Sequence, residues 1–548
     1  MLAYCASALV LLAPAAHAQG TAIVPPSDLI YADIDRLAEL GVLDSVIIGQ
    51  RPYSRREIAR IARVARDRLD RDGASRRSRL DEDASGYARE LLRRLDRFAG
   101  DAAGEGFGDP VVSLLDAASL WYNGTDTERR GFPSSYGSRT EATIDPIAVR
   151  RLGQPAVAGH VAAMELSQRI EPFSWLALQA RERLESRWPT DTALSERNGE
   201  LLLASVRARF RNVALTVGRQ QFAWSQSADD GLFLASDAPA LDQISLAADH
   251  PFVLPSVFRY LGPVQGTLIY ADLGPSVSRS HSRLLTYKVS VQPASVLELG
   301  GTFMNHFGGE GGRPSNFSDR LIDFLPFVDV FRKHNYRDTT RTFDVDSDKL
   351  LGVDGRLRIP VLAGVTIAGE LLIDDFDVYR IPKLLTGYGS QTIAVILPQI
   401  VTPALSLKLS AKHMGILTYT HAALLDGITT RGRLLGDELG PDAKSFSAQV
   451  RWDASAGARF ELEGRSAIYS NATYSGFYSD SAGTRYVVQK ISHTDDELRD
   501  IVMGSLILQN DDGIALTLRG GFERVRNADF QGGRRRDYVA QVGLRIGQ

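Results

Sequence analysis

Few residues of this sequence stand at the spacing that a reaction centre or a metal site requires. Ser280 and His281 are adjacent, but the sharp strand-to-helix turn that exposes a nucleophilic serine has no counterpart around them. The run Gly308–Gly312 lacks the lysine and the hydroxyl residue that complete a phosphate-binding loop. The nine histidines show no metal-ligand spacing. We therefore expect no catalytic residues, no metal ligands and no cofactor.

One segment carries side chains suited to binding. Tyr474, Phe477 and Tyr478 place three aromatic rings within five residues. Aromatic faces can pack on the C–H surfaces of sugars, which makes these three residues candidates for binding a polysaccharide. Aromatic residues of this kind also form the girdles of membrane proteins or pack inside loops. The sequence leaves both interpretations open.

The first eighteen residues have the layout of a signal peptide. An apolar run over Leu9–Ala16 leads into the small-residue cleavage site Ala16-His17-Ala18, so we expect residues 1–18 to be removed after export. The one cysteine, Cys5, lies in this leader, which leaves the mature chain without thiol chemistry. A net charge of −3 argues against a nucleic-acid partner. After the leader, the sequence contains no stretch of 18 apolar residues, so it predicts no transmembrane helix.

Residues 28–100 show helical periodicity. Apolar residues recur every three or four positions from Tyr31 to Leu40, and Gly41 follows as a natural stop. Ser54 and Glu57 form a capping box, in which the serine hydroxyl accepts from the amide of Glu57 and the glutamate reaches back to the amide of Ser54. Further apolar stripes run over 58–69 and 80–95. The sequence therefore predicts three short amphipathic helices that pack together or against a larger body.

From Phe107 onward the period changes to two. Val206 and Phe210 alternate with Arg207 and Arg209, and similar alternation recurs at 354–359, 405–410, 459–465 and 516–519. Successive side chains of a strand point to opposite faces, so each segment has one apolar and one charged face. The pattern is clear in the C-terminal half and ambiguous between 219 and 282.

The connections favour a membrane barrel over a soluble sandwich. Tight turns are expected at 171–173, 292–294, 453–455 and 510–513, whereas 305–349, 413–445 and 469–500 are long and polar. Short turns at one end and long loops at the other are typical of transmembrane barrels. A sandwich of this length would need several domains, and the sequence has no linker. At roughly 25 residues per strand and connection, residues 107–548 accommodate about 18 antiparallel strands.

The charged face predicts a polar interior. Glutamates such as Glu185, Glu461 and Glu463 share that face with seven arginines, Arg181, Arg183, Arg207, Arg209, Arg211, Arg356 and Arg358. The arginines alone would give an electropositive lumen that attracts an acidic glycan. Pairing with the glutamates would instead give a salt-bridged wall, which we favour because buried charges need partners.

Several segments, in order along nearly the whole chain, resemble the capsule-assembly Wzi family of Gram-negative outer membranes. They are DIDRLAELG at 33–41, RPYS at 51–54, GRQQFAW at 218–224, LASDAP at 234–239, YLGP at 260–263, LELG at 297–300, FGGEGGRP at 307–314 and GELLIDDF at 369–376. The sequence departs from the family at Ala223–Gln226, where the family has a Trp-Trp-Gly-Pro character, and its last residues lack the terminal aromatic that the barrel-assembly machinery reads.

The resemblance implies an outer-membrane barrel whose periplasmic end is blocked by helices and which anchors exported capsular polysaccharide at the cell surface without catalysis. On this basis we expect a leader over 1–18, a periplasmic helical plug over 19–106 and a barrel over 107–548. Arg219 and Trp224 lie where the resemblance is strongest, so they are candidates for polysaccharide contact at the lumen mouth. They would otherwise simply pair and pack inside the barrel.

Two other functions stay open. A barrel of about 18 strands can act as a passive, porin-like channel, and a barrel enzyme acting on lipid or glycan would need only a few residues such as Ser280 and His281. The expected partners are surface polysaccharide, outer-membrane lipid and the barrel-assembly machinery, with no nucleic acid.

Overall fold

A computed structural model gives the fold of the chain. It describes residues 20–74, 82–102, 110–127, 130–133, 139–144, 158–190, 195–227, 231–277, 279–312, 347–374, 389–421, 424, 426–455, 457–479 and 486–547. The expected leader lies outside these residues. Within them, no helix is long and apolar enough to cross a membrane.

The N-terminal segment, residues 20–102, is mainly helical. Its elements are β1 (Ile23–Val24), α1 (Ile30–Glu39), β2 (Tyr53–Ser54), α2 (Arg55–Ala74), α3 (Glu82–Leu95) and the 3-10 helix η1 (Asp96–Ala102). The three predicted helices are confirmed. Helix α1 ends where expected, because Gly41 takes a left-handed conformation with φ of 78° and turns the chain away.

The capping box before α2 forms only in part. The amide of Glu57 donates to the Ser54 hydroxyl at 3.1 Å, as predicted. The carboxylate of Glu57 accepts two hydrogen bonds from the guanidinium of Arg60 instead, at 2.6 and 2.7 Å. A charged donor one turn along the helix binds the carboxylate more strongly than the neutral amide of Ser54 would. The predicted reach-back contact is therefore wrong.

The apolar stripes of these helices pack on one another. Ile34, Leu37, Ile58, Ile61 and Leu91 are each at most 1% exposed and belong to one cluster that the three helices share. Most of the stability of helices in proteins comes from packing of an apolar face, so this shared core and the contacts with the barrel hold the segment in shape.

The rest of the chain forms a closed antiparallel barrel of 18 long strands within the described residues. The strands are β3 (Val111–Thr125), β6 (Gly159–Phe173), β7 (Leu176–Pro189), β8 (Glu196–Phe210), β9 (Val213–Gln220), β10 (Leu241–Ala248), β12 (Pro263–Asp272), β13 (Arg283–Ala294), β14 (Leu297–Phe307), β15 (Ser347–Ile359), β16 (Val365–Asp374), β17 (Ser390–Leu397), β18 (Leu405–Met414), β21 (Ala443–Ser455), β22 (Ala458–Tyr469), β25 (Glu497–Gln509), β26 (Ala515–Arg526) and β27 (Arg534–Gly547). The barrel closes where β27 pairs with β3. The predicted fold class is confirmed.

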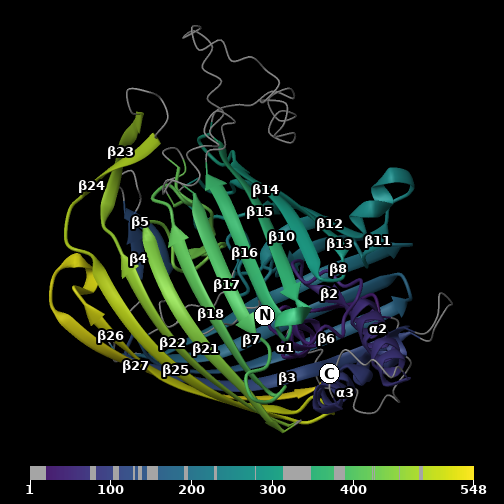
Figure 1. The fold of residues 1–548 in the computed structure, drawn as a ribbon. Helices are drawn as coiled ribbons and strands as arrows, with labels where there is room; N and C mark the ends of the chain where they lie inside the picture. Colours follow the sequence, from purple (N-terminus) through teal and green to yellow (C-terminus); the bar gives the residue numbers. More distant parts are fainter. Residues whose placement is uncertain are drawn as a thin grey trace.

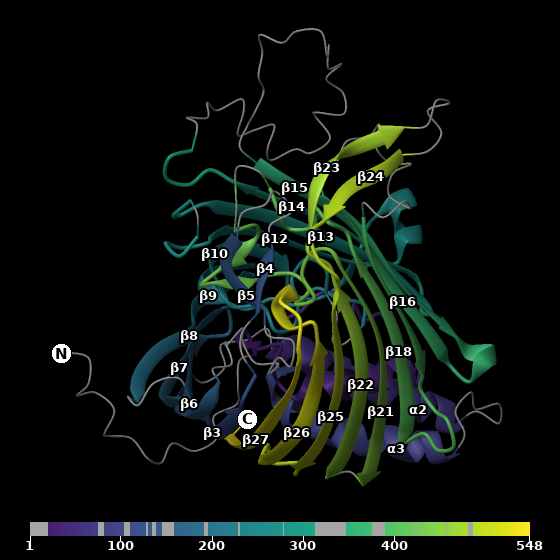
Figure 2. The same ribbon diagram turned by 90° about the vertical axis from the view of Figure 1, so that its left-hand side faces the viewer.

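Shorter elements decorate the wall. The two-residue strand β11 (Phe252–Val253) pairs beside β12, followed by the 3-10 helix η2 (Ser256–Leu261). Other 3-10 turns are η3 (Pro360–Leu362) and η5 (Ala528–Phe530). A small sheet joins β4 (Arg130–Pro133), β5 (Arg139–Ile144), β20 (Arg433–Leu434) and β19 (Thr429–Thr430), and a separate hairpin joins β23 (Ala472–Ser479) and β24 (Tyr486–Ser492) (Figure 2).

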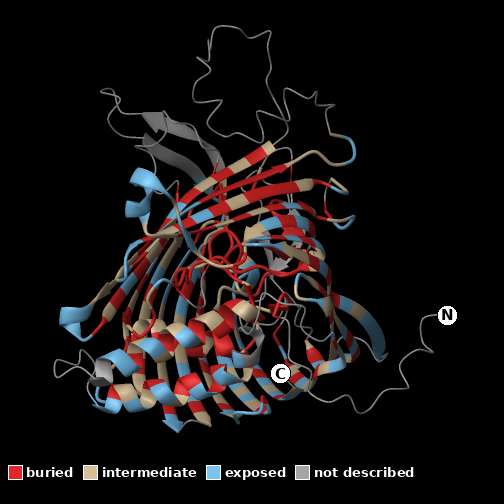
Figure 3. Ribbon diagram, turned by 90° about the vertical axis from the view of Figure 1, so that its right-hand side faces the viewer, coloured by how far each residue is buried: buried red, intermediate tan, exposed pale blue. Residues whose placement is uncertain are grey.

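The alternation of side chains along each strand separates two surfaces. On β9 the outward Leu215 and Val217 are 46% and 47% exposed, whereas Thr216 between them is 1% exposed. Val206 on β8 likewise points out, next to the buried Arg207. Figure 3 shows these alternating bands along the wall. A closed barrel with an apolar outer surface and a polar interior suits a bilayer, because each long strand pairs with a neighbour on both sides and the lipid meets apolar side chains.

The inward charges pair with one another, as predicted. Glu165 on β6 accepts from Arg181 and Arg183 of the neighbouring β7, each at 2.5 Å. Arg207 pairs with Asp249 at 2.7 Å. Arg209, Arg356 and Arg358 also donate to backbone carbonyls. Arg211 lies in the turn between β8 and β9, at φ of 52°, and covers the ring of Phe210. The prediction that Arg211 points inward is wrong, because the strand ends one residue before it.

The connections are short at one end of the barrel and long at the other. The predicted turn at 510–513 and the loop at 413–445 are confirmed. Three turns lie further along than predicted, because β6, β13 and β21 continue to Phe173, Ala294 and Ser455 before they end. In β6 and β13 the continuation passes Pro172 and Pro293. Register shifts between Ile170 and Phe173, and between Val291 and Ala294, accommodate these prolines, which cannot donate to the ladder.

The N-terminal segment lies inside the short-turn end of the barrel. The helices occupy the end opposite the one from which β23 and β24 project (Figure 1). Asp33 of α1 accepts from Arg459 of β22 at 2.6 Å, and the carbonyls of Glu39 and Leu40 accept from Arg358 of β15 at 2.9 and 3.0 Å. The strands β15 and β22 lie five strands apart along the wall. On the other side, the amide of Thr21 donates to Glu171 of β6, eight strands from β15, at 2.9 Å, so the segment spans the lumen.

Candidate functional site

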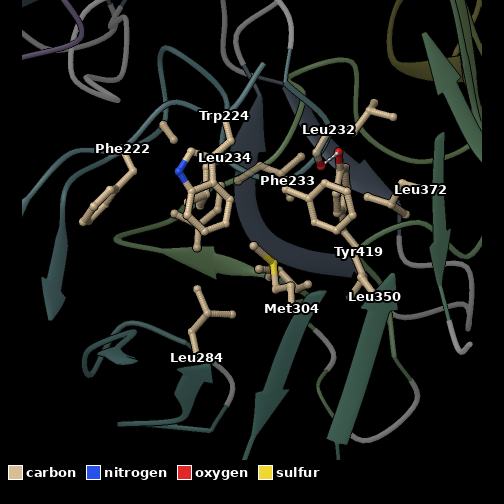
Figure 4. Packing of buried hydrophobic residues seen from close by; sticks show 14 of the residues in the cluster. Phe222, Trp224, Leu232, Phe233, Leu234, Leu284, Met304, Leu350, Leu372 and Tyr419 are labelled. Carbon is tan, nitrogen blue, oxygen red and sulfur yellow. Dashed lines mark hydrogen bonds between the residues drawn. The ribbon is translucent and has the colours of Figure 1, made fainter. Parts of the chain in front are cut away.

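Two long loops turn into the lumen. Residues 221–240, between β9 and β10, and residues 415–442, between β18 and β21, together form what we call the loop layer. The hydroxyl of Tyr419 donates to the carbonyl of Leu232 at 2.6 Å, and the amide of Ala235 donates to the carbonyl of Leu435 at 2.9 Å (Figure 4). The loop layer therefore binds itself across the barrel interior.

Apolar side chains anchor the loop layer to the wall. Phe222, Trp224 and Leu234 pack with Tyr419 in one cluster (Figure 4). The same cluster includes inward residues near the long-loop ends of several strands, which are Ile269, Leu284, Met304, Leu350 and Leu372. Burial of these apolar side chains holds the two loops in place inside an otherwise polar lumen.

A polar network joins the loop layer to the wall at Gln226. Its side-chain amide donates to Glu298 of β14 at 3.0 Å and to Asp354 of β15 at 2.6 Å, and Asp354 pairs with Lys288 of β13 at 2.7 Å. Its backbone amide donates to Glu370 of β16 at 3.2 Å. One glutamine thus links four adjacent wall strands to the loop layer.

The same network reaches the N-terminal segment. The carboxylate of Glu298 accepts from the amides of Ile48 and Gly49 at 2.9 Å each. Close by, Arg51 and Ala223 exchange two backbone hydrogen bonds, at 2.9 and 3.1 Å, as in a short antiparallel bridge. The loop layer and the N-terminal segment are therefore in direct contact in the middle of the barrel.

A polar cavity of about 350 Å³ remains between α1 and the opposite wall. Both signs of charge line it: Asp35 and Arg51 come from the N-terminal segment, and Lys408, Arg451 and Glu461 come from the wall. Such a cavity can hold water or a polar ligand of modest size.

Arg219, a candidate from the sequence, lies on the outward row of β9. It follows the exposed Leu215 and Val217 at the same spacing, and its partner Asp242 precedes the exposed Ile244 on β10. The guanidinium makes a two-point contact with the Asp242 carboxylate at 2.6 and 2.7 Å. The side chain therefore stands on the outer surface near the long-loop end, and its role in binding stays a prediction.

Trp224, the second candidate, is 1% exposed inside the loop layer. Its backbone pairs with Leu234, and its ring packs among the apolar residues of Figure 4. In this conformation the ring offers no surface to a sugar, so any influence of Trp224 on binding would act through the position of the loops.

The three aromatic candidates lie together on β23. The backbone of Tyr474 pairs with Lys490, that of Phe477 with Val488 and that of Tyr478 with Val487. Their side chains lie outside the described residues. The hairpin that carries them projects from the long-loop end of the barrel (Figure 1).

Ser280 and His281 do not form a nucleophile–base pair. The Ser280 hydroxyl donates to the carbonyl of Pro275 at 3.2 Å, and His281 Nδ1 lies 3.1 Å from the Asp272 carboxylate. Among the described residues, no group of three His, Cys, Asp or Glu side chains is arranged to hold a metal ion.

Sequence reasoning missed Gln226, Lys288 and Asp354. It noted Gln226 only as a departure from the family pattern, and no periodicity marks a loop residue that turns into a lumen. Lys288 and Asp354 alternate with apolar residues like every other inward position, so nothing in the sequence distinguishes them from the rest of the wall.

Comparison with known proteins connects this architecture to one family. The family model described as capsule assembly protein Wzi matches residues 129–388, which include β9, the first part of the loop layer and the strands around Gln226. The resemblance to the Wzi family is confirmed. This match covers the GRQQFAW, LASDAP and GELLIDDF segments that carried the resemblance in the sequence.

A solved structure of a Wzi protein supports the same fold. The Wzi outer-membrane protein of Escherichia coli, described as a carbohydrate-binding β-barrel involved in group 1 capsule assembly, is 14% identical, with a TM-score of 0.65 over 96% of this chain and 99% of its own. OccD3 and OprD of Pseudomonas aeruginosa are 10% and 9% identical, with TM-scores of 0.45 and 0.43 over 80% of this chain and 92% and 95% of their own. No curated protein sequence matches. The chain thus has a Wzi-type barrel fold along nearly its whole length.

Proposed function

We propose that this chain is an outer-membrane barrel that binds and anchors exported capsular or extracellular polysaccharide at the cell surface, without catalysing a reaction. The observation that carries the proposal is the filled lumen. The N-terminal segment spans it at the short-turn end, and the loop layer spans it above, with direct contact between Arg51 and Ala223. A barrel filled in this way is suited to retention at its surface and not to passage through it.

The family match supports the assignment to capsule assembly, and the E. coli Wzi protein, which shares the fold, is itself described as carbohydrate-binding. Transmembrane barrels have short periplasmic turns and long extracellular loops. By this rule the N-terminal helices, within residues 19–106, are the periplasmic plug, the loop layer and β23–β24 face the outside, and 107–548 is the membrane-embedded barrel. Lipid and the barrel-assembly machinery are then its partners in the envelope.

In this proposal, residues on the extracellular face contact the polysaccharide. Tyr474, Phe477 and Tyr478 belong to the projecting hairpin, and aromatic rings bind sugar rings by stacking. Arg219, on the outer rim, adds a planar donor that can bind hydroxyl or carboxylate groups. Trp224 contributes by holding the loop layer in place.

A deletion strain tests the proposal. We expect the polymer to be made in the usual amount but released, so that the cell-bound fraction falls and the fraction in the medium rises. Restoring the wild-type gene should reverse this, and a variant with Tyr474, Phe477 and Tyr478 all changed to Ala should not. Tyr538→Ala, on the outward row of β27, is the matched control and should restore retention. An unchanged cell-bound fraction in the deletion strain would refute the proposal.

A further inference from the structure

Within the described residues, the barrel wall is weakly joined between β8 and β9. Strand β9 ends at Gln220, and its last pair with β8 joins Arg219 to Ala204. Strand β8 starts at Glu196, so residues 196–203 continue past this pair. Strand β7 pairs with them on the other side, but no strand of the described residues pairs with them on the β9 side. At about 3.3 Å per residue, this open edge is roughly 26 Å long. We call it the seam.

Side chains take the place of the missing ladder. Arg219 donates to the carbonyl of Leu201 at 2.8 Å while it holds Asp242. Arg431, in the turn between β19 and β20, reaches the same place from the loop layer: it lies 3.2 Å from Glu200 and 3.8 Å from Asp242. We call these four charged residues the seam cluster.

The seam cluster is a weaker joint than a strand ladder. Its members are between 24% and 50% exposed, and exposed ion pairs contribute about 1 kcal/mol or less each. The neighbouring pairs β7–β8 and β9–β10 are joined by ladders of backbone hydrogen bonds, with a register shift in β7–β8 between Arg181 and Glu182. The wall is therefore held less firmly at the seam than along the paired strands on either side of it.

The seam leads from the outer surface to the interior. Outside, Leu184 and Leu201 are 47% and 44% exposed and stand on the outward row beside the seam cluster, next to the exposed Glu182. Inside, a small cavity of about 60 Å³ is lined by Leu203 and Arg219 and extends to Ile23 of the N-terminal segment. This cavity shares lining residues, Glu165 and Arg181 among them, with the larger polar cavity.

We propose that the seam is a lateral binding site for an amphiphile, a glycan linked to an acyl chain. The saccharide lies on the seam cluster, whose planar guanidinium and carboxylate groups match sugar hydroxyls, and the acyl chain lies along Leu184 and Leu201 in the membrane. A glycan without an acyl chain would leave Leu184 and Leu201 without a contact, and a hydrocarbon without a saccharide would leave the charged groups of the seam cluster without one. The inference rests on the proposed function and names the part of the polymer that this surface holds: its acylated end.

Binding to the purified protein in lipid nanodiscs tests this. The probes are the surface polysaccharide of the producing strain, the same polymer after alkaline deacylation, and lipopolysaccharide from that strain. We expect the acylated polymer to bind about tenfold more tightly than the deacylated one. In the double variant Arg219→Gln, Asp242→Asn, this ratio should fall towards one. The matched control is Arg526→Gln, Asp500→Asn, an equally exposed pair on β26 and β25, which should keep the ratio.

A crosslink gives a second test that keeps the barrel intact. The mature chain has no cysteine, so Glu200→Cys and Arg431→Cys can be joined by a short bismaleimide across the seam. The crosslinked protein should lose the tenfold preference, and the same variant without the crosslinker should bind acylated polymer more tightly than the crosslinked form does.

The outcomes separate the two proposals. Equal binding of acylated and deacylated polymer to the wild type overturns the seam site and leaves the proposed function standing. Failure of both polymers to bind overturns the proposed function. A seam-dependent gain for lipopolysaccharide alone supports the same site chemistry and makes lipopolysaccharide the source of the amphiphile.

Discussion

Asp33 joins the N-terminal segment to the wall through two arginines. It is 1% exposed and accepts from Arg94 of α3 at 2.7 and 2.8 Å and from Arg459 of β22 at 2.6 Å. Burial alone would raise the pKa of this carboxyl, but the hydrogen bonds of Arg94 and the charge of Arg459 outweigh burial and lower it. The carboxylate is therefore charged and fully paired at neutral pH.

Asp33→Asn should loosen the N-terminal segment. The amide keeps the shape but removes the carboxylate that Arg94 and Arg459 share, and Arg459 keeps Asp453 at 2.9 Å. Breaking a buried pair of this kind costs about 3 kcal/mol. We expect amide hydrogen exchange in α1 and α3 to rise by about a hundredfold, as measured by mass spectrometry. Asp67→Asn, exposed on α2, is the control and should leave exchange unchanged. Equal exchange in all three proteins would show that Asp33 does not hold the segment.

Asp28 makes the same attachment sensitive to acid. Burial would raise the pKa of this carboxyl, yet Arg545 of β27 and Arg97 lower it from 3.8 to about 2. A lowered pKa in the folded state gives stability that is present above about pH 4 and lost as the pH falls towards 2. The shift corresponds to about 2 kcal/mol. Exchange in α1 should therefore rise on acidification from pH 4 to pH 2, and Asp28→Asn should remove part of that slope. An identical slope in the variant would contradict this assignment.

For single residues, the sequence predicts which face of a strand a charged side chain lies on, but not which residue it pairs with. That Arg207 and Arg183 face inward follows from period two, because lipid excludes them from the other face. That Arg219 faces outward and pairs with Asp242 does not follow, because it depends on β9 ending one residue later and on the register with β10.

At the level of the elements, hydrogen bonds connect the loop layer with the N-terminal segment inside the lumen. Gln226 contacts Glu298, and Glu298 holds the amides of Ile48 and Gly49. Because a buried acceptor that loses a donor is costly, movement at either level disturbs the other. The geometry gives a physical route between the loop layer and the opposite end of the barrel.

Gln226→Ala should loosen both levels at once. The change removes the donors to Glu298 and Asp354, so we expect about a tenfold rise in hydrogen exchange at Ile48 and Gly49 as well as around Leu232. Gln531→Ala, exposed between β26 and β27, provides the control. A rise confined to the loop layer would mean that the two levels are independent.

The elements themselves were largely predictable. The stop at Gly41 and the Ser54 cap depend on neighbours a few residues away, so a single sequence contains the necessary information. The extension of β6 and β13 through prolines was not predictable, because the register shifts that accept them depend on the partner strand.

For the whole molecule, one physical constraint makes the strands of the wall predictable from the sequence. The same constraint does not predict how the N-terminal segment and the loop layer fill the lumen. Lipid outside and a polar lumen inside impose the alternation seen at Val206 and Arg207, which is why about 18 strands could be counted in advance. The filling depends on packing between distant segments: Tyr419 bonds Leu232 across 187 residues of sequence. The local sequence of two long polar loops contains no pattern that predicts such a contact.

The most direct test of the account is the conductance of the intact protein in a planar bilayer. Barrels of 16 to 18 strands with an open lumen form aqueous channels. Because the N-terminal segment and the loop layer fill this lumen, we predict no stable conductance steps at any voltage that the bilayer withstands. Steady, porin-like openings of the full-length protein would contradict the claim that this barrel is filled and acts by binding.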